Sequence, residues 1–350
     1  MKEKWVVSAK KADFQAIGQH FGIDPVLARI MRNRGLTDLQ EMNLYLHGTR
    51  TDLNDPHLLK DADLAAQILR EKIKEKKRIR IIGDYDIDGI QSTYILYCAL
   101  RRLGADADFV IPDRILDGYG LNEHLVTRAS QDGIDTILTC DNGISAIDQI
   151  HLAKSLGMTV VVTDHHEVPF TEVDGVRREK VCEADAVVNP KQQACHYPFK
   201  KLCGAAVAFK LVQVLYEVFG LEVSEADCFI ENAGFATVGD VMDLQGENRI
   251  LVKLGLEMLN RTTNIGMKAL ILQNKLTMGA IKSHDIGFRI GPCLNASGRL
   301  KTAQMAMELL LAENKAQADE LADALKALND ERKDMTKDGT DAAIEQVETE

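Results

Sequence analysis

The sequence predicts an α/β protein, with a mostly parallel, Rossmann-like sheet flanked by helices and followed by a helical subdomain. Short β-branched and apolar runs alternate with segments of helical length, which is the pattern of βαβ units. Clusters of polar residues follow these runs and never precede them. Because crossovers between parallel strands are right-handed, the clusters should converge on one edge of the sheet, the edge where ligands bind.

Five segments have the length and composition of buried strands. They span residues 78–82, 107–111, 136–140, 159–163 and 186–188. The helices predicted around them span residues 61–76, 90–103 and 145–156. The rest of residues 175–201 is predicted to be a long polar loop. Later helices are predicted at residues 203–219, 224–237 and 302–311, and Gly204 in the first of these allows close backbone approach.

These elements suggest three parts. Residues 1–55 form an N-terminal segment of short helical patterns. Residues 56–312 form the main domain, with the sheet at about 78–190 and a helical part at about 202–312. Residues 313–350 are charged and helix-forming with a thin apolar stripe, as in the start of a helix that connects two domains.

The composition excludes a protein that coats nucleic acid by bulk charge, because the formal net charge is −11. It still allows an enzyme with a local basic track. Seven scattered cysteines without a C-x-x-C pair indicate a reduced, cytoplasmic protein. No apolar run reaches membrane-spanning length, and no apolar signal-peptide core follows Met1, so no membrane contact is expected.

Asp84, Asp86 and Asp88 occupy alternate positions on the turn between the first strand and the next helix. Crowded carboxylates repel one another unless a cation lies among them, which favours a divalent metal. The simpler alternative is an acidic loop in which Asp88 caps the helix.

Further candidate ligands occur at the ends of later strands and of one helix. Together with the first turn they give the set Asp86, Asp88, Asp141, His165 and Asp240. Carboxylates with one imidazole suit Mn²⁺ or Mg²⁺, and five ligands suffice for the two ions of metal-assisted phosphoester hydrolysis. His166 is placed to hydrogen-bond the phosphate or to protonate the leaving oxygen. The alternatives are a surface histidine pair and, for Asp240, a satisfied core carboxylate.

Residues 290–299 contain a possible phosphate cradle. Asn295, Ser297 and Arg299 stand just before the helix predicted at 302–311. Backbone N–H groups and a guanidinium at such a place are predicted to bind a phosphate.

The motifs together resemble the DHH phosphoesterase superfamily. The four superfamily motifs are residues 83–89, Asp141-Asn142-Gly143, Asp164-His165-His166 and Val238-Gly239-Asp240. One subgroup, the RecJ family of single-stranded-DNA-specific 5′→3′ exonucleases, is indicated by further segments. These are Arg114 with Gly118-Tyr119-Gly120, Val188-Asn189-Pro190-Lys191, residues 197–205 and residues 291–300.

The resemblance implies a Mn²⁺- or Mg²⁺-dependent nuclease of recombination and repair that acts on single-stranded DNA. The five ligands would hold two ions with Asp141 as the bridge, and Asp84 and His166 would support them. Arg114 and Arg299 would contact DNA phosphates. Single-strand-binding protein and a helicase are the partners that the resemblance implies. Cys293 stands where relatives often carry arginine, which suggests a missing phosphate contact.

The resemblance also indicates an N-terminal fragment that lacks the family's second domain and OB fold and so is weakly active or inactive. Two rival functions stay open. One is a DHH phosphodiesterase for short oligonucleotides or cyclic dinucleotides, and the other is a non-catalytic replication scaffold with the same fold.

Overall fold

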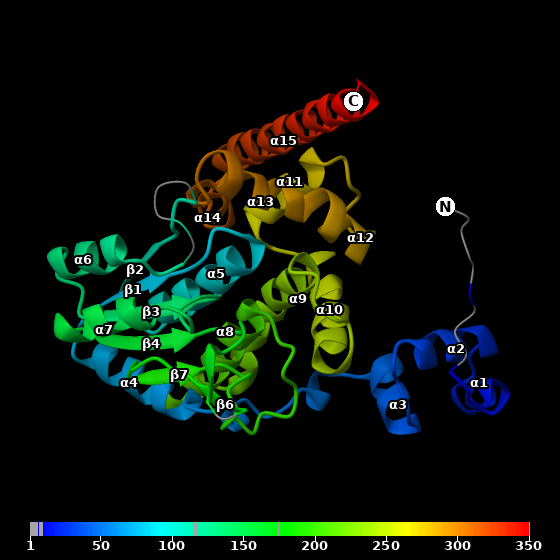
Figure 1. The fold of residues 1–350 in the computed structure, drawn as a ribbon, viewed down its shortest axis with the longest axis horizontal. Coiled ribbons are helices and arrows are strands. Elements are labelled where there is room, and N and C mark those ends of the chain that lie inside the picture. Colours follow the sequence, from blue (N-terminus) through cyan, green and yellow to red (C-terminus); the bar gives the residue numbers. More distant parts are fainter. Residues whose placement is uncertain (1–5, 7–9, 115–117, 119, 174, 350) are drawn as a thin grey trace.

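The computed structural model describes residues 6, 10–114, 118, 120–173 and 175–349 (Figure 1). Its centre is a five-stranded, wholly parallel sheet with the strand order β2-β1-β3-β4-β7. The strands are β1 (Arg78–Ile82), β2 (Asp106–Val110), β3 (Thr136–Cys140), β4 (Thr159–Thr163) and β7 (Ala186–Val188). The predicted fold class is confirmed, and the predicted strand positions agree with the observed ones to within one residue.

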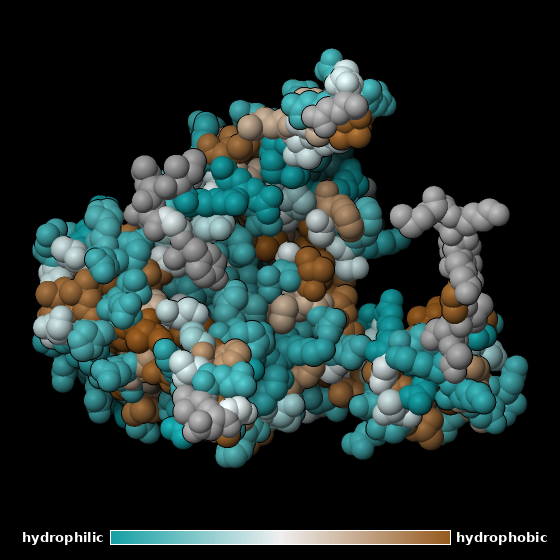
Figure 2. Space-filling view, in the orientation of Figure 1, coloured by the Kyte–Doolittle hydropathy of each residue, from teal (hydrophilic) through white to brown (hydrophobic). Residues whose placement is uncertain are grey.

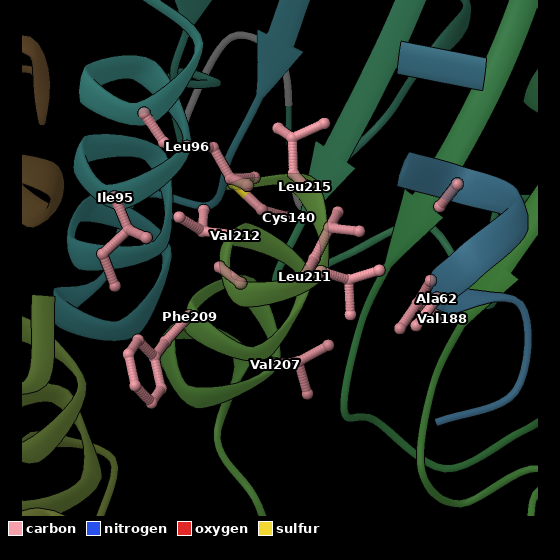
Figure 3. Close-up of a cluster of buried hydrophobic side chains, with 14 of the residues drawn as sticks. Ala62, Ile95, Leu96, Cys140, Val188, Val207, Phe209, Leu211, Val212 and Leu215 are labelled. Carbon is pink, nitrogen blue, oxygen red and sulfur yellow. The ribbon is translucent and has the colours of Figure 1, made fainter. Parts of the chain in front are cut away.

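Helices cover both faces of the sheet because successive strand side chains point to opposite sides. Ile81, Leu138 and Val161 join one buried cluster with helices α4 (Ala62–Lys74), α5 (Ile87–Arg102) and α8 (Gly204–Val218). Figure 3 shows α5 and α8 side chains of this cluster turned toward each other. Ile82 and Val162 join a second cluster with α6 (Glu123–Gln131) and α7 (Ile147–Ser155).

The strand order creates a switch point between β1 and β3. The chain leaves β1 through α5 to reach β2 on one side, and it leaves β3 through α7 to reach β4 on the other. Because α5 and α7 lie on opposite faces, the crevice at the carboxyl ends of β1 and β3 is the place where α/β sheets bind ligands.

The helical part follows the sheet and surrounds a third buried cluster. Its elements are η3 (Val223–Phe229), α9 (Ile230–Gly239), α10 (Gly246–Leu259), α11 (Ile265–Gln273), α12 (Ser283–Asp285), η4 (Ile286–Ile290), α13 (Gly291–Leu300) and α14 (Gln304–Leu310). One prediction was wrong here. The helix expected at 224–237 is divided between η3 and α9. Residues 291–300, for which no element was predicted, form α13.

The helix α15 (Lys315–Thr349) is 35 residues long. Its first half packs on α11, α13 and α14, and Leu325 and Leu328 of the predicted apolar stripe are buried there. In Figure 1 its second half extends away from the body. Within the described ranges, no helix has both the length and the apolar character needed to cross a membrane.

The N-terminal helices α1 (Phe14–Phe21), α2 (Pro25–Asn33) and α3 (Leu39–His47) form a lobe at one side of the molecule (Figure 1). Met31, Leu36, Met42 and Tyr45 make a small buried cluster of their own. Short helices η1 (Arg50–Asp52) and η2 (Pro56–Leu58) lead to the main body. The division at residues 55 and 312 stays a prediction, and residues 1–5 lie outside the described part.

The start of the predicted polar loop is one strand of a hairpin, whose other strand precedes the loop. Strands β5 (Phe170–Val173) and β6 (Val176–Glu179) pair in antiparallel fashion apart from the main sheet. The sequence of β6 carries no alternating apolar face, since Val176 to Arg178 are all exposed. Backbone pairing between β5 and β6 therefore formed strands that the hydrophobic pattern did not indicate.

His57 forms ion pairs that connect the start of the main body to α8, and these pairs depend on pH. Its Nδ1 lies 2.6 Å from Asp63 and its Nε2 lies 2.9 Å from Glu217. Burial opposes the imidazolium charge, but the two carboxylates outweigh it and raise the pKa of His57 above 6.5.

A raised folded-state pKa means that the contribution of His57 to stability is complete below the unfolded-state value of 6.5 and is lost as the pH rises through the folded-state value. We therefore expect His57→Gln to lower the free energy of unfolding at about pH 6 and to change it little at about pH 9. Urea unfolding of both proteins at the two pH values measures the difference. An equal loss of unfolding free energy at both pH values would assign the effect to packing.

Candidate metal centre

The turn after β1 carries the three alternate aspartates. Asp86 caps α5, because its Oδ1 accepts hydrogen bonds from the N–H groups of Asp88 at 2.9 Å and Gly89 at 3.1 Å. The alternative in which Asp88 caps the helix is therefore wrong. A Cβ on Gly89 would lie 2.4 Å from the carbonyl oxygen of Asp84, so this tight turn requires glycine.

Asp88 is fully buried and is held by the first residues of α8. Its two carboxylate oxygens accept hydrogen bonds from the N–H groups of Gly204 at 2.6 Å and Ala205 at 2.8 Å. A Cβ on Gly204 would lie 2.7 Å from the Cβ of Asp141. The close approach predicted for Gly204 is thus confirmed, and it brings α8, Asp88 and Asp141 together.

Asp141 directly follows β3 in a left-handed backbone conformation, with a φ of +60°. This region is uncommon for residues other than glycine, although aspartate and asparagine adopt it more readily than most. The Asp141 N–H donates a 3.1 Å hydrogen bond to the carbonyl of Thr163 at the end of β4. The side chain is thereby fixed in the crevice between the strands.

Asp164, His165 and His166 follow β4. Buried Asp164 accepts hydrogen bonds through Oδ1 from the N–H groups of both histidines and from His166 Nδ1 at 2.8 Å, and its Oδ2 accepts one from Ile144 N–H. Burial opposes the Asp164 charge, but the bonds from His166 outweigh it and lower the pKa of Asp164. Asp164 therefore positions His166.

Asp240 arrives from the helical part, at the end of α9. Its Oδ2 lies 3.8 Å from His165 Nε2, and the same nitrogen lies 3.0 Å from Asp141 Oδ1 and 3.5 Å from Asp88 Oδ2. In Figure 1 the strand arrows point toward this region, and Figure 2 shows hydrophilic residues gathered at the middle of the same face. Residues far apart in the chain thus meet at one edge of the sheet.

Potential ligand atoms form three overlapping groups, in each of which all atoms lie within 4.8 Å of one another. The groups are Asp88–His165–Asp240, Asp84–Asp86–Asp141 and Asp141–His165–His166. Together they contain all seven residues predicted for the metal ligands and their supporting groups. Asp141 and His165 each belong to two of the groups, and of these two only the carboxylate has two oxygens with which to bridge a pair of cations.

The carboxylates of this cluster destabilise one another's ionised forms. Burial and the charge of Asp86 raise the pKa of Asp84 to about 7. Burial and the charge of Asp88 raise the pKa of Asp240 to about 7 and also raise that of Asp86. Burial, with Asp88 and Asp86, holds the pKa of Asp141 well above its ordinary range. This cluster therefore favours a positive charge at its centre.

His165 leads to the same conclusion. Burial lowers its pKa, so the ring is neutral, the form that ligates metals. Its Nδ1 is buried without a hydrogen-bond partner among the described residues. Its Nε2 lies among the carboxylate oxygens of Asp88, Asp141 and Asp240, so in the tautomer protonated at Nδ1 the Nε2 lone pair can bind the same cation as those oxygens. The residues therefore fit a divalent metal with oxygen ligands and one imidazole.

Comparison with known proteins gives the same family for sequence and structure. Residues 78–232 match the DHH family, N-terminal domain. The single-stranded-DNA-specific exonuclease RecJ of Bacillus subtilis is 37% identical over 348 residues, which are 99% of this chain and 42% of that protein. A crystal structure of exonuclease RecJ bound to manganese is 33% identical, with a TM-score of 0.73 over 82% of this chain and 70% of the other. The chain belongs to the RecJ family of DHH proteins.

A second solved structure extends this match. RecJ from Thermus thermophilus in complex with Mn²⁺ is 30% identical, with a TM-score of 0.75, over 93% of this chain and 44% of that one. The chain spans less than half the length of the Bacillus relative, 42%.

The substrate-binding roles of Asn295 and Ser297 stay predictions in this RecJ-family chain, although these residues do not lie in a phosphate-binding loop. Asn295 and Ser297 lie inside α13, so their backbone N–H groups belong to a helix. The Asn295 side chain accepts a 2.7 Å hydrogen bond from Ile87 N–H, and the buried Ser297 hydroxyl donates to the carbonyl of Leu294. Asn295 therefore anchors the start of α5, and the Ser297 hydroxyl bonds within its own helix.

The two predicted arginine contacts lie near this anchor. Arg299 is exposed at the end of α13. The Arg114 guanidinium lies 5.5 Å from the centre of the Tyr85 ring, beside the acidic turn. Tyr119 of the motif lies outside the described residues. Cys293 is fully buried against Asn274 and Asn329, so this position faces the core and not a phosphate.

Sequence reasoning missed two positioning residues. Asp164 was part of a recognised motif but was not assigned a role. Asn189, fully buried after β7, donates a 3.0 Å hydrogen bond to the carbonyl of His166 and accepts one from Lys191 N–H. The signal was present, since Asn-Pro-Lys follows a strand as the other polar clusters do.

Proposed function

We propose that this chain is the catalytic part of a metal-dependent exonuclease that hydrolyses phosphodiester bonds in single-stranded DNA. The observation that supports it is the convergence of Asp88, Asp141, His165 and Asp240, from four separate elements, on one buried point. The relatives are named single-stranded-DNA-specific exonucleases, and manganese and magnesium occur in solved structures of RecJ.

We assign the metal ligands to Asp86, Asp88, Asp141, His165 and Asp240, with Asp141 shared between two Mn²⁺ or Mg²⁺ ions. When bound, such ions lower the pKa of a water and offset the negative charge on the phosphate. Asp84 adds negative charge beside Asp86 and so strengthens cation binding. Asp88 keeps its orientation through its hydrogen bonds to α8.

His166 is the proton donor of the proposed reaction. Burial disfavours its charged form, but the contact with Asp164 outweighs burial and raises the pKa of His166. Its side chain is 44% exposed, so a substrate can reach it. With Nδ1 held by Asp164, the opposite nitrogen Nε2 serves to hydrogen-bond the phosphate or to protonate the leaving oxygen.

Arg114 and Arg299 are the proposed contacts to DNA phosphates. Digestion in the 5′→3′ direction and cooperation with single-strand-binding protein and a helicase are further parts of the proposal. All seven cysteines are free, which suits work in a reducing cytoplasm.

The decisive experiment compares Mn²⁺-dependent degradation of 5′- and 3′-labelled single strands, the same sequence as a duplex, and dinucleotides. Preferential loss of the single strands from the 5′ end is expected. Preferential cleavage of dinucleotides would favour a short-oligonucleotide phosphodiesterase. The absence of any metal-dependent cleavage would favour a non-catalytic scaffold.

His166→Ala is expected to lower kcat by about 100-fold because proton transfer contributes that much or more. The Kd for Mn²⁺, measured by calorimetry, is expected to change much less than kcat because the five proposed ligands are intact. A Mn²⁺ affinity that falls by a factor of ten or more would instead make His166 a ligand. Asp164→Asn weakens the hold on the ring and also replaces an acceptor of backbone N–H groups by a donor, so it serves as a second variant that keeps the imidazole.

A further inference from the structure

Val241, the residue after Asp240, has a conformation that its sequence disfavours. Its φ is +57°, a left-handed value that is a genuine outlier for a β-branched residue. It occupies the position after the α9 C-cap in a Schellman motif, with Met242 N–H bonded to Thr237 O and Val241 N–H to Val238 O. Glycine is the usual residue there. The Val241 side chain is 88% exposed, so packing does not compensate for the strain.

A second exposed apolar side chain lies on the neighbouring element. Phe288 is 68% exposed on η4, a five-residue π-helix, a form that is rare and frequent at functional sites. Its ring stacks on the exposed ring of His284, with 4.7 Å between centroids and 25° between planes. Two stacked rings are thus presented to solvent.

Close packing joins these features to the metal centre. A Cβ on Gly287 would lie 4.0 Å from Val238 Cγ1, which places η4 against the end of α9 that carries Asp240 and Val241. Cβ atoms on Gly239 and Gly291 would both collide with Ile87, the residue between Asp86 and Asp88. Figure 2 shows hydrophobic groups over the α9 region, beside the hydrophilic middle of the face.

The charged residues near Phe288 indicate which kind of ligand covers its exposed ring. Arg289 lines a pocket of about 400 Å³ with Lys275, Lys326 and Lys333. Asp330 in the lining pairs with Lys326 and Lys333, and Asp285 pairs with Arg289, so cations still outnumber carboxylates by four to two among the described residues there. Phe288 precedes Arg289 in the chain, and exposed rings combined with a mostly basic pocket suit a polyanion with flat apolar groups more than they suit another protein's apolar face. A single nucleic-acid strand has this chemistry, because each base offers a π-face and each phosphate a negative charge.

We infer that Val241 and the Phe288–His284 ring pair form a stacking platform that receives unpaired bases next to the metal centre. This inference rests on the proposed function and adds to it a feature that selects single strands. A base within a duplex is covered on both faces by its neighbours, so it cannot stack on the platform.

DNA binding measured in EDTA tests the platform, because metal-dependent hydrolysis cannot occur there. Fluorescence anisotropy with the 350-residue chain compares labelled oligothymidylate with the same strand made abasic along its length. Phe288→Ala is expected to weaken binding of oligothymidylate about tenfold and to leave the abasic strand unaffected. Phe288→Tyr, which keeps the ring, is expected to restore binding. Leu156→Ala, an exposed apolar residue after α7 at the opposite edge of the sheet, is the matched control.

Val241→Gly provides an independent readout. Glycine accepts the left-handed conformation, so the thermal midpoint should rise while the affinity for oligothymidylate falls. The platform would be overturned if Phe288→Ala bound oligothymidylate as tightly as the wild type does. It would also be overturned if the substitution weakened binding of oligothymidylate and of the abasic strand equally. If the platform variants behave as expected but no metal-dependent hydrolysis occurs in Mn²⁺, the proposed function fails and the platform stands.

Discussion

Asp141→Asn is expected to lower metal-dependent hydrolysis about 1000-fold and to make the metal-free protein more stable. The carboxylate is shared by two of the three ligand groups, so its loss affects both proposed ions. Several kcal/mol of transition-state stabilisation correspond to this factor. Asparagine tolerates the left-handed backbone at this position better than alanine does, which keeps the fold unchanged.

The gain in stability follows from the electrostatics of the cluster. Burial and four neighbouring carboxylates disfavour the ionised Asp141 in the folded protein, and a neutral amide removes that repulsion. Thermal unfolding in EDTA should therefore give a higher midpoint for the variant. Added Mn²⁺ should raise the midpoint of the wild type and raise that of the variant much less.

Asp106→Asn is the matched control, because Asp106 is an exposed aspartate at the start of β2, at the opposite edge of the sheet. It should leave both activity and the Mn²⁺ response unchanged. Full activity of Asp141→Asn would refute the assignment of the site. A lower midpoint in EDTA would show that Asp141 stabilises the fold and does not strain it.

The sheet could be predicted from the sequence because its strands are buried on both faces. Strands such as Thr159–Thr163 are continuous β-branched runs, and their ends coincide with polar residues. The hairpin of β5 and β6 could not be predicted in this way, since its strands are mostly exposed and carry no hydrophobic period.

The metal cluster was predictable for the same reason. Asp141 and His165 follow strands whose positions are clear, and parallel strands end at one edge. Asp240 follows a helix and not a strand. It was predicted to be a ligand because burying an unpaired carboxylate is costly. The role of Asn295 was not predictable, because its partner, the Ile87 N–H, is 208 residues away in the chain. Such a contact depends on how α13 docks, which local pattern does not specify.

Glu247→Gln is expected to lower the free energy of unfolding by about 3–5 kcal/mol, although Glu247 belongs to no proposed site. Its Oε1 lies 2.8 Å from Lys210 Nζ, and both side chains are almost completely buried. Tyr197 OH donates to its Oε2 at 2.6 Å, and Asn54 N–H donates to its Oε1 at 2.8 Å. This network joins α8, α10 and the segment that leads from the N-terminal lobe.

The amide leaves the Lys210 ammonium buried without its counter-charge, which is the costly half of breaking a buried pair. Asp243→Asn is the matched control, because it makes the same change in an ion pair with Lys201 that is exposed on both sides. Such pairs contribute about 0–1 kcal/mol, so urea unfolding of this variant should resemble that of the wild type. A loss below about 1 kcal/mol for Glu247→Gln would mean that the network tolerates a neutral partner.

The pH dependence of the loss separates charge from packing. Burial already lowers the pKa of Lys210 in the wild type, and Glu247 opposes this effect. Without Glu247 the folded-state pKa falls further below its unfolded value, so the unfolded state binds more protons and stability rises with pH. The deficit of Glu247→Gln should therefore shrink as the pH is raised from about 7 to about 9.5. A deficit that stays constant over this range would attribute the loss to hydrogen-bond geometry at Tyr197 and Asn54 and not to the stranded ammonium.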